Sequence, residues 1–201
     1  MCRFIETIRI EGGRAWNLDL HNRRMNATRA AVWGRVEPLR LEDVIHPGGY
    51  AGRTRCRVVY GRRVEQVEYF PYRIRPVKSL TMVDCDEADY RYKSADRSLL
   101  DRLFALRGAA DDVLIVRRGL ITDTSIANVA LWDGTGWYTP SHPLLCGTRR
   151  ASLLAQGVLA ERDIPATEVG RYQKMRLFNA MIPFGEVELP CAAVSYHSTN
   201  S

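Results

Sequence analysis

Residues 111–154 read DDVLIVRRGLITDTSIANVALWDGTGWYTPSHPLLCGTRRASLL. Strand-like apolar runs flank a single acid, Asp123, and a Gly-Thr-Arg-Arg turn at residues 147–150 then leads into a helical pattern. The dipeptides Arg118-Gly119 and Asp133-Gly134 predict two consecutive hairpins. The stretch therefore predicts a sheet of hairpins that carries an acid, followed directly by the start of a helix.

Gly147 and Thr148 fall where this helix is expected to begin. The first turn of a helix leaves backbone N–H groups unpaired, and the helix dipole favours an anion there. Gly allows close approach of the backbone and Thr adds a hydroxyl donor, so a phosphate cradle is plausible. An ordinary capped helix start fits the same residues. No GxxxxGK[ST] loop occurs, and no GxGxxG follows a strand, which argues against nucleotide triphosphates and dinucleotides.

The organisation of the chain favours two domains. Alternating residues 4–10 predict a strand, and the pattern after it predicts a helix that ends at Gly34. A short helix is expected at residues 39–45, and a further helix at residues 149–163. A Pro-containing stretch near residues 72–78 is the expected linker. The expected fold class is α/β (α+β), with a small N-terminal α/β domain over residues 1–74 and a larger C-terminal domain over residues 79–201.

Bulk properties exclude several protein classes. The 201 residues are 46% hydrophobic, but they contain no run of about 18 apolar residues, so a membrane span is not expected. The N-terminus lacks the apolar core of a secretion signal. Five dispersed cysteines without a CxxC pair suit a cytoplasmic protein, and four dispersed histidines indicate no metal site. The charge of +6 is spread along the chain, which favours an Arg-rich enzyme over a nucleic-acid binder.

Lysine is rare in this chain. Of 29 Lys and Arg residues only three are lysines, Lys78, Lys93 and Lys174. Pyridoxal 5′-phosphate (PLP) is a phosphate-bearing cofactor that bonds to a lysine, and it needs a phosphate cradle and an acid opposite its pyridine nitrogen. A nearby carboxylate raises the pKa of that nitrogen and keeps it protonated. The sequence offers a candidate for each part.

Four motifs in order carry a family resemblance. LITDTSIANVALWDGTGWYTP followed by LLCGTRRASLL resembles the class IV aminotransferases, the fold-type IV PLP-dependent enzymes. YRYKSADRSLLDRLFALR lies where that family has its Schiff-base lysine, and DLHNRRMNATR matches its His-x-x-Arg helix. LFNAMIPFGEVELP is similar to the Asn-Ala-Leu-Met-Pro stretch of 4-amino-4-deoxychorismate lyases. The resemblance implies a two-domain fold whose C-terminal domain is a mixed α/β pseudo-barrel.

The resemblance implies roles for individual residues. Lys93 would be the Schiff-base lysine, and Arg24 would bind the cofactor phosphate. Asp123 falls at the pyridine-nitrogen carboxylate, which is usually Glu in the family and is one methylene shorter here. A surface lysine and an Asx-turn aspartate remain the alternatives for Lys93 and Asp123.

The remaining cofactor residues follow from the same motifs. Gly147, Thr148 and Arg149 would form the phosphate cradle, although the family usually has an Ile between Gly and Thr. Asn128 would fix the strand or loop beside the ring. Asn179 would belong to a second loop on the phosphate side.

The resemblance also implies an amino-acid-type substrate and a homodimer. We expect a 4-amino-4-deoxychorismate lyase that forms p-aminobenzoate and pyruvate. A branched-chain or D-amino-acid aminotransferase is the alternative, and a non-catalytic PLP-binding homologue is a further one. Arg53, Arg55 and Arg57 alternate along one strand, so two of them could face a shared site for substrate carboxylates. An exposed basic strand explains them equally well.

Overall fold

The computed structural model describes residues 2–196 of the chain. The chain forms two compact units. The first contains the chain up to Ile74 together with Tyr92–Asp96, and the second contains Arg75–Arg91 and the chain from Arg97 onward. The five-residue segment Tyr92–Asp96 is therefore separated in sequence from the rest of its unit.

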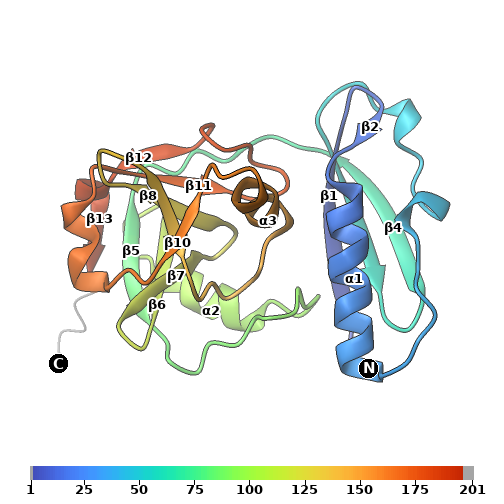
Figure 1. Ribbon diagram of the computed structural model, residues 1–201, viewed down its shortest axis with the longest axis horizontal. Helices are drawn as coiled ribbons and strands as arrows, with labels where there is room; N and C mark the ends of the chain where they lie inside the picture. Colours follow the sequence, from blue (N-terminus) through green and yellow to red (C-terminus); the bar gives the residue numbers. More distant parts are fainter. Residues whose placement is uncertain (1, 197–201) are drawn as a thin grey trace. The chain divides into compact units, whose positions relative to one another are not determined.

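The first unit is an antiparallel sheet of four strands in the order β2-β1-β3-β4, with helix α1 beside it (Figure 1). Alternating residues of β1 and β3 point toward α1, and Ile8, Ile10, Met25, Cys56 and Val58 are completely buried there. The elements are β1 (Phe4–Glu11), β2 (Arg14–Ala15), α1 (Leu18–Trp33), β3 (Thr54–Tyr60) and β4 (Val64–Pro71).

The expected first strand and first helix are confirmed, and Gly34 ends α1 with a positive φ of 72°. The helix expected at residues 39–45 is wrong. Only a short 3-10 turn, Leu41–Asp43, forms there, and a second one follows at Pro47–Gly49. Pro47 disfavours the helical conformation of the residue before it, and His46 is indeed non-helical with φ −125° and ψ 82°, so the turn does not continue as a regular helix.

Tyr92–Asp96 joins the first unit through the backbone of β1. The N–H of Ile5 donates to the Lys93 carbonyl (2.9 Å), and Phe4 forms an isolated antiparallel bridge with Ser94. Strand β2 pairs only with Ile10 and Glu11, so this segment pairs with the other end of β1. Lys93 is thereby held beside the first strand of the chain.

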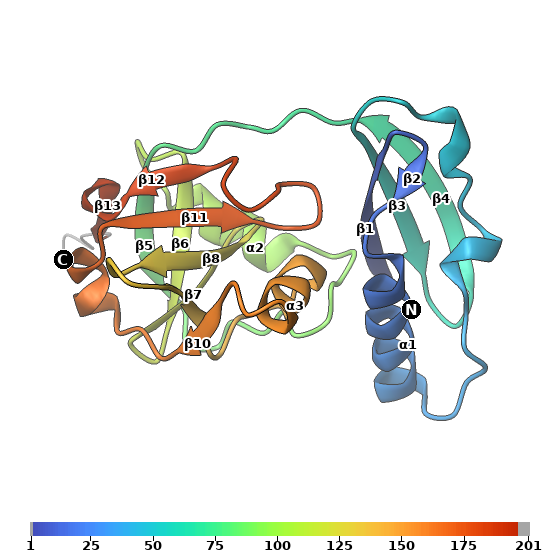
Figure 2. The same cartoon turned by 45° about the horizontal axis from the view of Figure 1, so that its top comes forward.

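In the second unit, the described strands form a path in the order β10-β9-β8-β7-β6-β5-β13. Figure 2 shows β11 alongside β8, with β12 on the other side of β11. The strands are β5 (Leu80–Asp84), β6 (Asp112–Arg117), β7 (Leu120–Thr124), β8 (Asn128–Trp132), β9 (Trp137–Pro140), β10 (Ala160–Arg162), β11 (Lys174–Phe178), β12 (Glu188–Pro190) and β13 (Val194–Tyr196). The helices are α2 (Ser98–Ala105) and α3 (Thr148–Ala155), with 3-10 turns at Ala166–Arg171 and Cys191–Ala193.

Both predicted hairpins are present. Arg118 and Gly119 form the β6–β7 turn with positive φ values of 52° and 74°. The β8–β9 loop is longer than the Asp133-Gly134 turn expected, because Trp132 pairs with Trp137 across residues 133–136. The Asp133 carboxylate accepts hydrogen bonds from Thr135 and Gly136 and so stabilises this wider loop.

The helix expected at residues 149–163 is shorter than predicted. It ends at Ala155, and Gly157 follows with a positive φ of 69°. Ala160–Arg162 then pairs in parallel with β9 as strand β10. Val158 and Leu159 lie between the end of α3 and β10, so the chain after Gly157 leads into an edge strand and not into another helical turn.

Strands β7 and β8 are joined by one register pair among the described residues, Asp123 with Asn128. β8 also pairs with β11 along its whole length and with β9 at Leu131 and Trp132, so Asp123–Asn128 is the pair that connects β7 to this part of the sheet. No helix within residues 2–196 has both the length and the apolar composition needed to cross a membrane.

Candidate active site

Asp123 is a buried acid near the end of β7, with only 5% of its surface exposed. Its Oδ1 accepts a hydrogen bond from Asn128 Nδ2 (2.8 Å), and its Oδ2 accepts one from the Leu145 N–H (2.9 Å). Burial raises the pKa of Asp123 to about 6, although both donors favour the ionised form. Such an acid changes its charge close to neutral pH.

Asn128 connects this acid to the turn that precedes α3. Its Nδ2 also donates to the Leu145 carbonyl (2.9 Å). On the other side of its amide, a Cβ added to Gly147 would lie 2.1 Å from Asn128 Oδ1. The φ of Gly147 is −68°, so close approach of Asn128, and not backbone strain, requires glycine here.

The start of α3 has the features of an anion site. Thr148 is the first helical residue, and the first turn contains no acidic residue. The Arg149 guanidinium is half-buried, and its buried Nε has no hydrogen-bond partner among the described residues. Burial lowers the pKa of Arg149. An anion bound at this helix start would offset the cost of burying the Arg149 guanidinium, whose Nε has no hydrogen-bond partner among the described residues.

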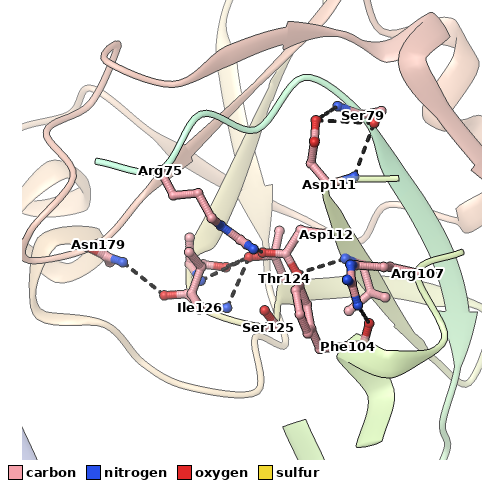
Figure 3. A network of polar contacts seen from close by, with 12 residues as sticks. Arg75, Ser79, Phe104, Arg107, Asp111, Asp112, Thr124, Ser125, Ile126 and Asn179 are labelled. Carbon is pink, nitrogen blue, oxygen red and sulfur yellow. Dashed lines mark hydrogen bonds and ion pairs between the residues drawn. The ribbon is translucent and has the colours of Figure 1, made fainter. Parts of the chain in front are cut away.

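The loop between β7 and β8 is tied to the loop after β11. Figure 3 shows Asn179 reaching the Ile126 carbonyl, to which its Nδ2 donates at 2.9 Å. The Asn179 Oδ1 accepts from the N–H groups of Met181 and Ile182. Asn179 thus shapes the backbone around the Asp123–Asn128 loop.

The end of the predicted linker is fixed within the second unit. Arg75 pairs with the buried Asp112 (2.9 Å), and the Asp111 carboxylate accepts the N–H group of Ser79 (Figure 3). The same carboxylate accepts the N–H group of Lys78 at 2.7 Å. The second unit is therefore anchored from Arg75 onward.

In the first unit, a completely buried carboxylate, Glu6, lies between an imidazole and a guanidinium. Arg24 donates from Nε to Glu6 Oε1 (2.9 Å) and from Nη2 to Oε2 (2.5 Å), while His21 Nδ1 lies 2.5 Å from Oε2. Burial opposes ionisation of Glu6, but Arg24 and His21 lower its pKa to about 2. Burial also lowers the pKa of His21 against the attraction of Glu6. Because ionised Glu6 can only accept, His21 must donate from Nδ1.

Lys93 is half-buried and belongs to this same electrostatic environment, since its charge contributes to lowering the pKa of His21. The other two lysines are placed differently. Lys78 is exposed, and Lys174 pairs with Glu188 at 3.3 Å. Lys93 is the lysine that lies next to a buried polar cluster.

The three strand arginines lie on the other face of the first sheet. Arg55 is directly opposite Arg9 across the β1–β3 ladder, whereas Glu6 and the core residues alternate with them toward α1. Arg57 pairs with Glu68 (2.8 Å), and Arg53 lies 3.6 Å from Glu11. The Arg55 guanidinium lies 4.9 Å from the Phe70 ring centre, and its buried Nε has no hydrogen-bond partner among residues 2–196.

The structure groups the predicted site residues in two sets. Arg24 and Lys93 belong to the first unit, where both are close to β1, and Arg53 and Arg55 lie on the opposite sheet face. The second unit holds the remaining predicted residues, Asp123, Asn128, Gly147, Thr148, Arg149 and Asn179. Direct contacts join Asp123, Asn128 and the turn before α3.

Sequence reasoning missed Glu6 and the Leu145 N–H. A carboxylate at an inward-facing position of an alternating strand was the available signal for Glu6. No side-chain pattern could have indicated a backbone donor at Leu145.

The predicted residues of the second unit fit a small group that combines a phosphate with a protonated ring nitrogen. They include an acid whose pKa is about 6, and a helix start beside a guanidinium that lacks a partner at Nε among the described residues. Lys93 and Arg24 lie in the first unit.

Comparison with known proteins agrees with this chemistry. The model of the family described as amino-transferase class IV matches residues 63–188. An uncharacterized protein from Haemophilus influenzae is 36% identical over 185 residues, which cover 90% of this chain and 98% of that protein.

Two solved structures extend the comparison. A candidate 4-amino-4-deoxychorismate lyase from Haemophilus somnus 129PT has 32% identity and a TM-score of 0.83, over 90% of this chain and 97% of its own. The PLP-bound form of a hypothetical aminotransferase from Mycobacterium tuberculosis has 20% identity and a TM-score of 0.75, over 92% and 80% of the two chains, and shows a shared fold. The chain therefore belongs to the amino-transferase class IV family, and its mixed α/β fold is of fold type IV, as the sequence motifs predicted.

Proposed function

We propose that the chain is a PLP-dependent enzyme that acts on an amino-acid-type substrate as a 4-amino-4-deoxychorismate lyase, forming p-aminobenzoate and pyruvate. The observation that carries the proposal is the buried Asp123 carboxylate, joined through Asn128 to the turn that opens α3. Similarity to the Haemophilus somnus protein over nearly the whole chain supports the lyase over other reactions of the family. The five free cysteines support a cytoplasmic location.

The proposed roles follow from the chemistry of each side chain. When bound, PLP supplies an electron sink for the bonds at the substrate α-carbon. Lys93 would be the residue that holds PLP through its amine and that moves a proton to and from the substrate. The Asp123 carboxylate would favour the protonated form of the pyridine nitrogen.

Binding and orientation fall to the other predicted residues. Gly147, Thr148, Arg149 and Arg24 bind the phosphate. Glu6 holds Arg24 by a bidentate pair, which fixes the plane of its guanidinium. Asn128 and Asn179 keep the loop between β7 and β8 in place. Arg53 and Arg55 lie on the sheet face opposite Glu6, so they would bind substrate carboxylates only if that face lines the substrate site.

The cofactor role of Lys93 can be tested by absorption spectroscopy. PLP added to the wild-type protein should give the absorption band of a lysine-bound cofactor, and Lys93→Ala should abolish it. Lys78→Ala and Lys174→Ala are matched controls that should keep the band. Borohydride reduction followed by peptide mapping should place the adduct on Lys93. A band that survives in Lys93→Ala would refute this assignment.

The reaction itself needs a separate assay. Incubation with 4-amino-4-deoxychorismate should release p-aminobenzoate and pyruvate in equal amounts. The family also includes aminotransferases, so branched-chain and D-amino acids with a 2-oxo acid acceptor form the second arm. If the amino-acid donor is converted to its 2-oxo acid and no p-aminobenzoate is released from 4-amino-4-deoxychorismate, the enzyme is an aminotransferase and the lyase proposal is wrong. No turnover in either arm, with PLP bound, would indicate a non-catalytic binder.

A further inference from the structure

Asp123 and Asn128 join strands β7 and β8 through both their backbone register and a side-chain hydrogen bond. They form the single register pair between β7 and β8 among the described residues, and both residues are buried, with 5% of the surface of each exposed. The Asn128 amide donates to the Asp123 carboxylate at 2.8 Å. The acid is therefore held at the point where two parts of the sheet join.

The same amide reaches a third segment. Asn128 Nδ2 donates to the Leu145 carbonyl, and the Leu145 N–H donates back to Asp123 Oδ2, both at 2.9 Å. Asp123, Asn128 and Leu145 thus form a closed ring of hydrogen bonds. The ring links β7 and β8 to the segment that leads into α3.

Gly147 extends this connection to the helix start. A side chain on Gly147 would collide with Asn128 Oδ1, since the added Cβ would lie 2.1 Å away. The Gly147 carbonyl accepts the Ala151 N–H at 2.9 Å, so its backbone already belongs to the first turn of α3. The position of Asn128 therefore restricts the position of the turn.

We propose that Asn128 is a positioning residue that locks Asp123 to the turn Leu145–Gly147, so that the acid and the anion-binding helix start move as one rigid piece. The inference rests on the proposed function for its link to PLP. In a cofactor with a phosphate at one end and a ring nitrogen at the other, both ends must be held at a fixed separation. Asn128 sets that separation, and Gly147 is glycine because Asn128 fills the space beside it.

The first test is a double-mutant cycle on the steric contact. Gly147→Ala should weaken PLP binding at least about tenfold, because Ala fits the backbone but displaces Asn128. In the Asn128→Ala background the same substitution should cost about twofold or less. Inorganic phosphate binding, measured by calorimetry on the cofactor-free protein, provides a second readout. Gly170→Ala, which meets no atom within 4 Å, is the matched control and should leave both affinities unchanged.

The second test concerns the acid and uses the cofactor-free protein. The groups that face Asp123 are the Asn128 amide, the N–H groups of Leu144 and Leu145, and the Arg150 guanidinium. Carboxyl 13C NMR with labelled aspartate, assigned by Asp123→Asn, should show that Asn128→Ala raises the pKa of Asp123. Loss of a hydrogen bond to the charged form has this direction. Asn128→Ser, which keeps one donor, should restore part of the shift, and it replaces Asn128→Ala if that variant does not fold.

Outcomes of these tests separate the two proposals. Failure of the wild-type protein to bind PLP would overturn the proposed function. The titration of Asp123 and the double-mutant cycle measured with inorganic phosphate would still test the role of Asn128. Additive costs of Gly147→Ala and Asn128→Ala, or a pKa of Asp123 that does not respond to Asn128, would overturn the locking role. Shifted titration together with a non-additive cycle would support it.

Discussion

At the scale of single residues, Asp123 belongs to the proposed site, and burial of its ionised carboxylate destabilises the fold. Burial raises the pKa of this carboxyl from 3.8 to about 6. The folded state therefore binds a proton more tightly than the unfolded state. Stability from this group is fully present below the unfolded pKa and is lost as the pH rises through the folded value.

Asp123→Asn should remove this pH dependence. From about pH 4 to about pH 8, the free energy of unfolding of the variant should gain about 2 kcal/mol relative to the wild type, since one pKa unit corresponds to about 1.4 kcal/mol and unfolded Asp123 is already partly ionised at pH 4. Urea denaturation of the cofactor-free proteins across this pH range measures the difference. The exposed Asp163→Asn serves as the control and should follow the wild-type curve. Parallel curves for Asp123→Asn and the wild type would show that Asp123 does not titrate in this window.

Single-residue roles were only partly predictable. Asp123 and Asn128 could be selected because they follow one another in a motif, and the structure places them in direct contact. The inward-facing position of Glu6 on an alternating strand indicated its burial, but its partners His21 and Arg24 lie on a helix whose docking on β1 the sequence does not reveal. The burial of Glu6 was therefore predictable from the sequence, and its pairing was not.

At the scale of elements, hairpins were predicted better than helix lengths. Turn residues act locally, so Arg118-Gly119 identified its turn correctly. The helix expected at residues 149–163 failed because a strand of the same sheet competes for Ala160–Arg162. The β8–β9 loop was wider than expected because the Asp133 carboxylate bonds to the loop backbone. Strand pairing thus set the end of α3, and side-chain hydrogen bonds set the length of the β8–β9 loop.

The β6–β7 turn provides a test of element stability. Gly119 has a φ of 74° with no atom within 4 Å of an added Cβ, so Gly119→Ala adds backbone strain without a steric clash. We expect a loss of about 1–2 kcal/mol in the free energy of unfolding. Gly170→Ala has the same open surroundings without a positive φ, and it should be neutral or slightly stabilising. Equal effects of the two substitutions in urea denaturation would show that strain at Gly119 is not significant.

At the scale of the whole molecule, chain order and spatial grouping differ. The order of the expected elements and the Pro-containing linker predicted two contiguous ranges, yet Tyr92–Asp96 lies with the first unit after the chain has entered the second. This return depends on backbone pairing of Ile5 and Phe4 with Lys93 and Ser94, for which side-chain pattern carries no signal. The lysine of the proposed mechanism is thus attached to the smaller unit by main-chain bonds.

The assembly state is the remaining whole-molecule prediction. We expect a homodimer, because the class IV resemblance implies an active site near a dimer contact. Light scattering over a range of concentrations should give twice the mass of the chain, and PLP should favour the dimer if each site needs its neighbour. PLP affinity should then fall when the protein is diluted below its dimerisation constant. A monomer that binds PLP with unchanged affinity at every concentration would instead show that one copy of this chain forms a complete site.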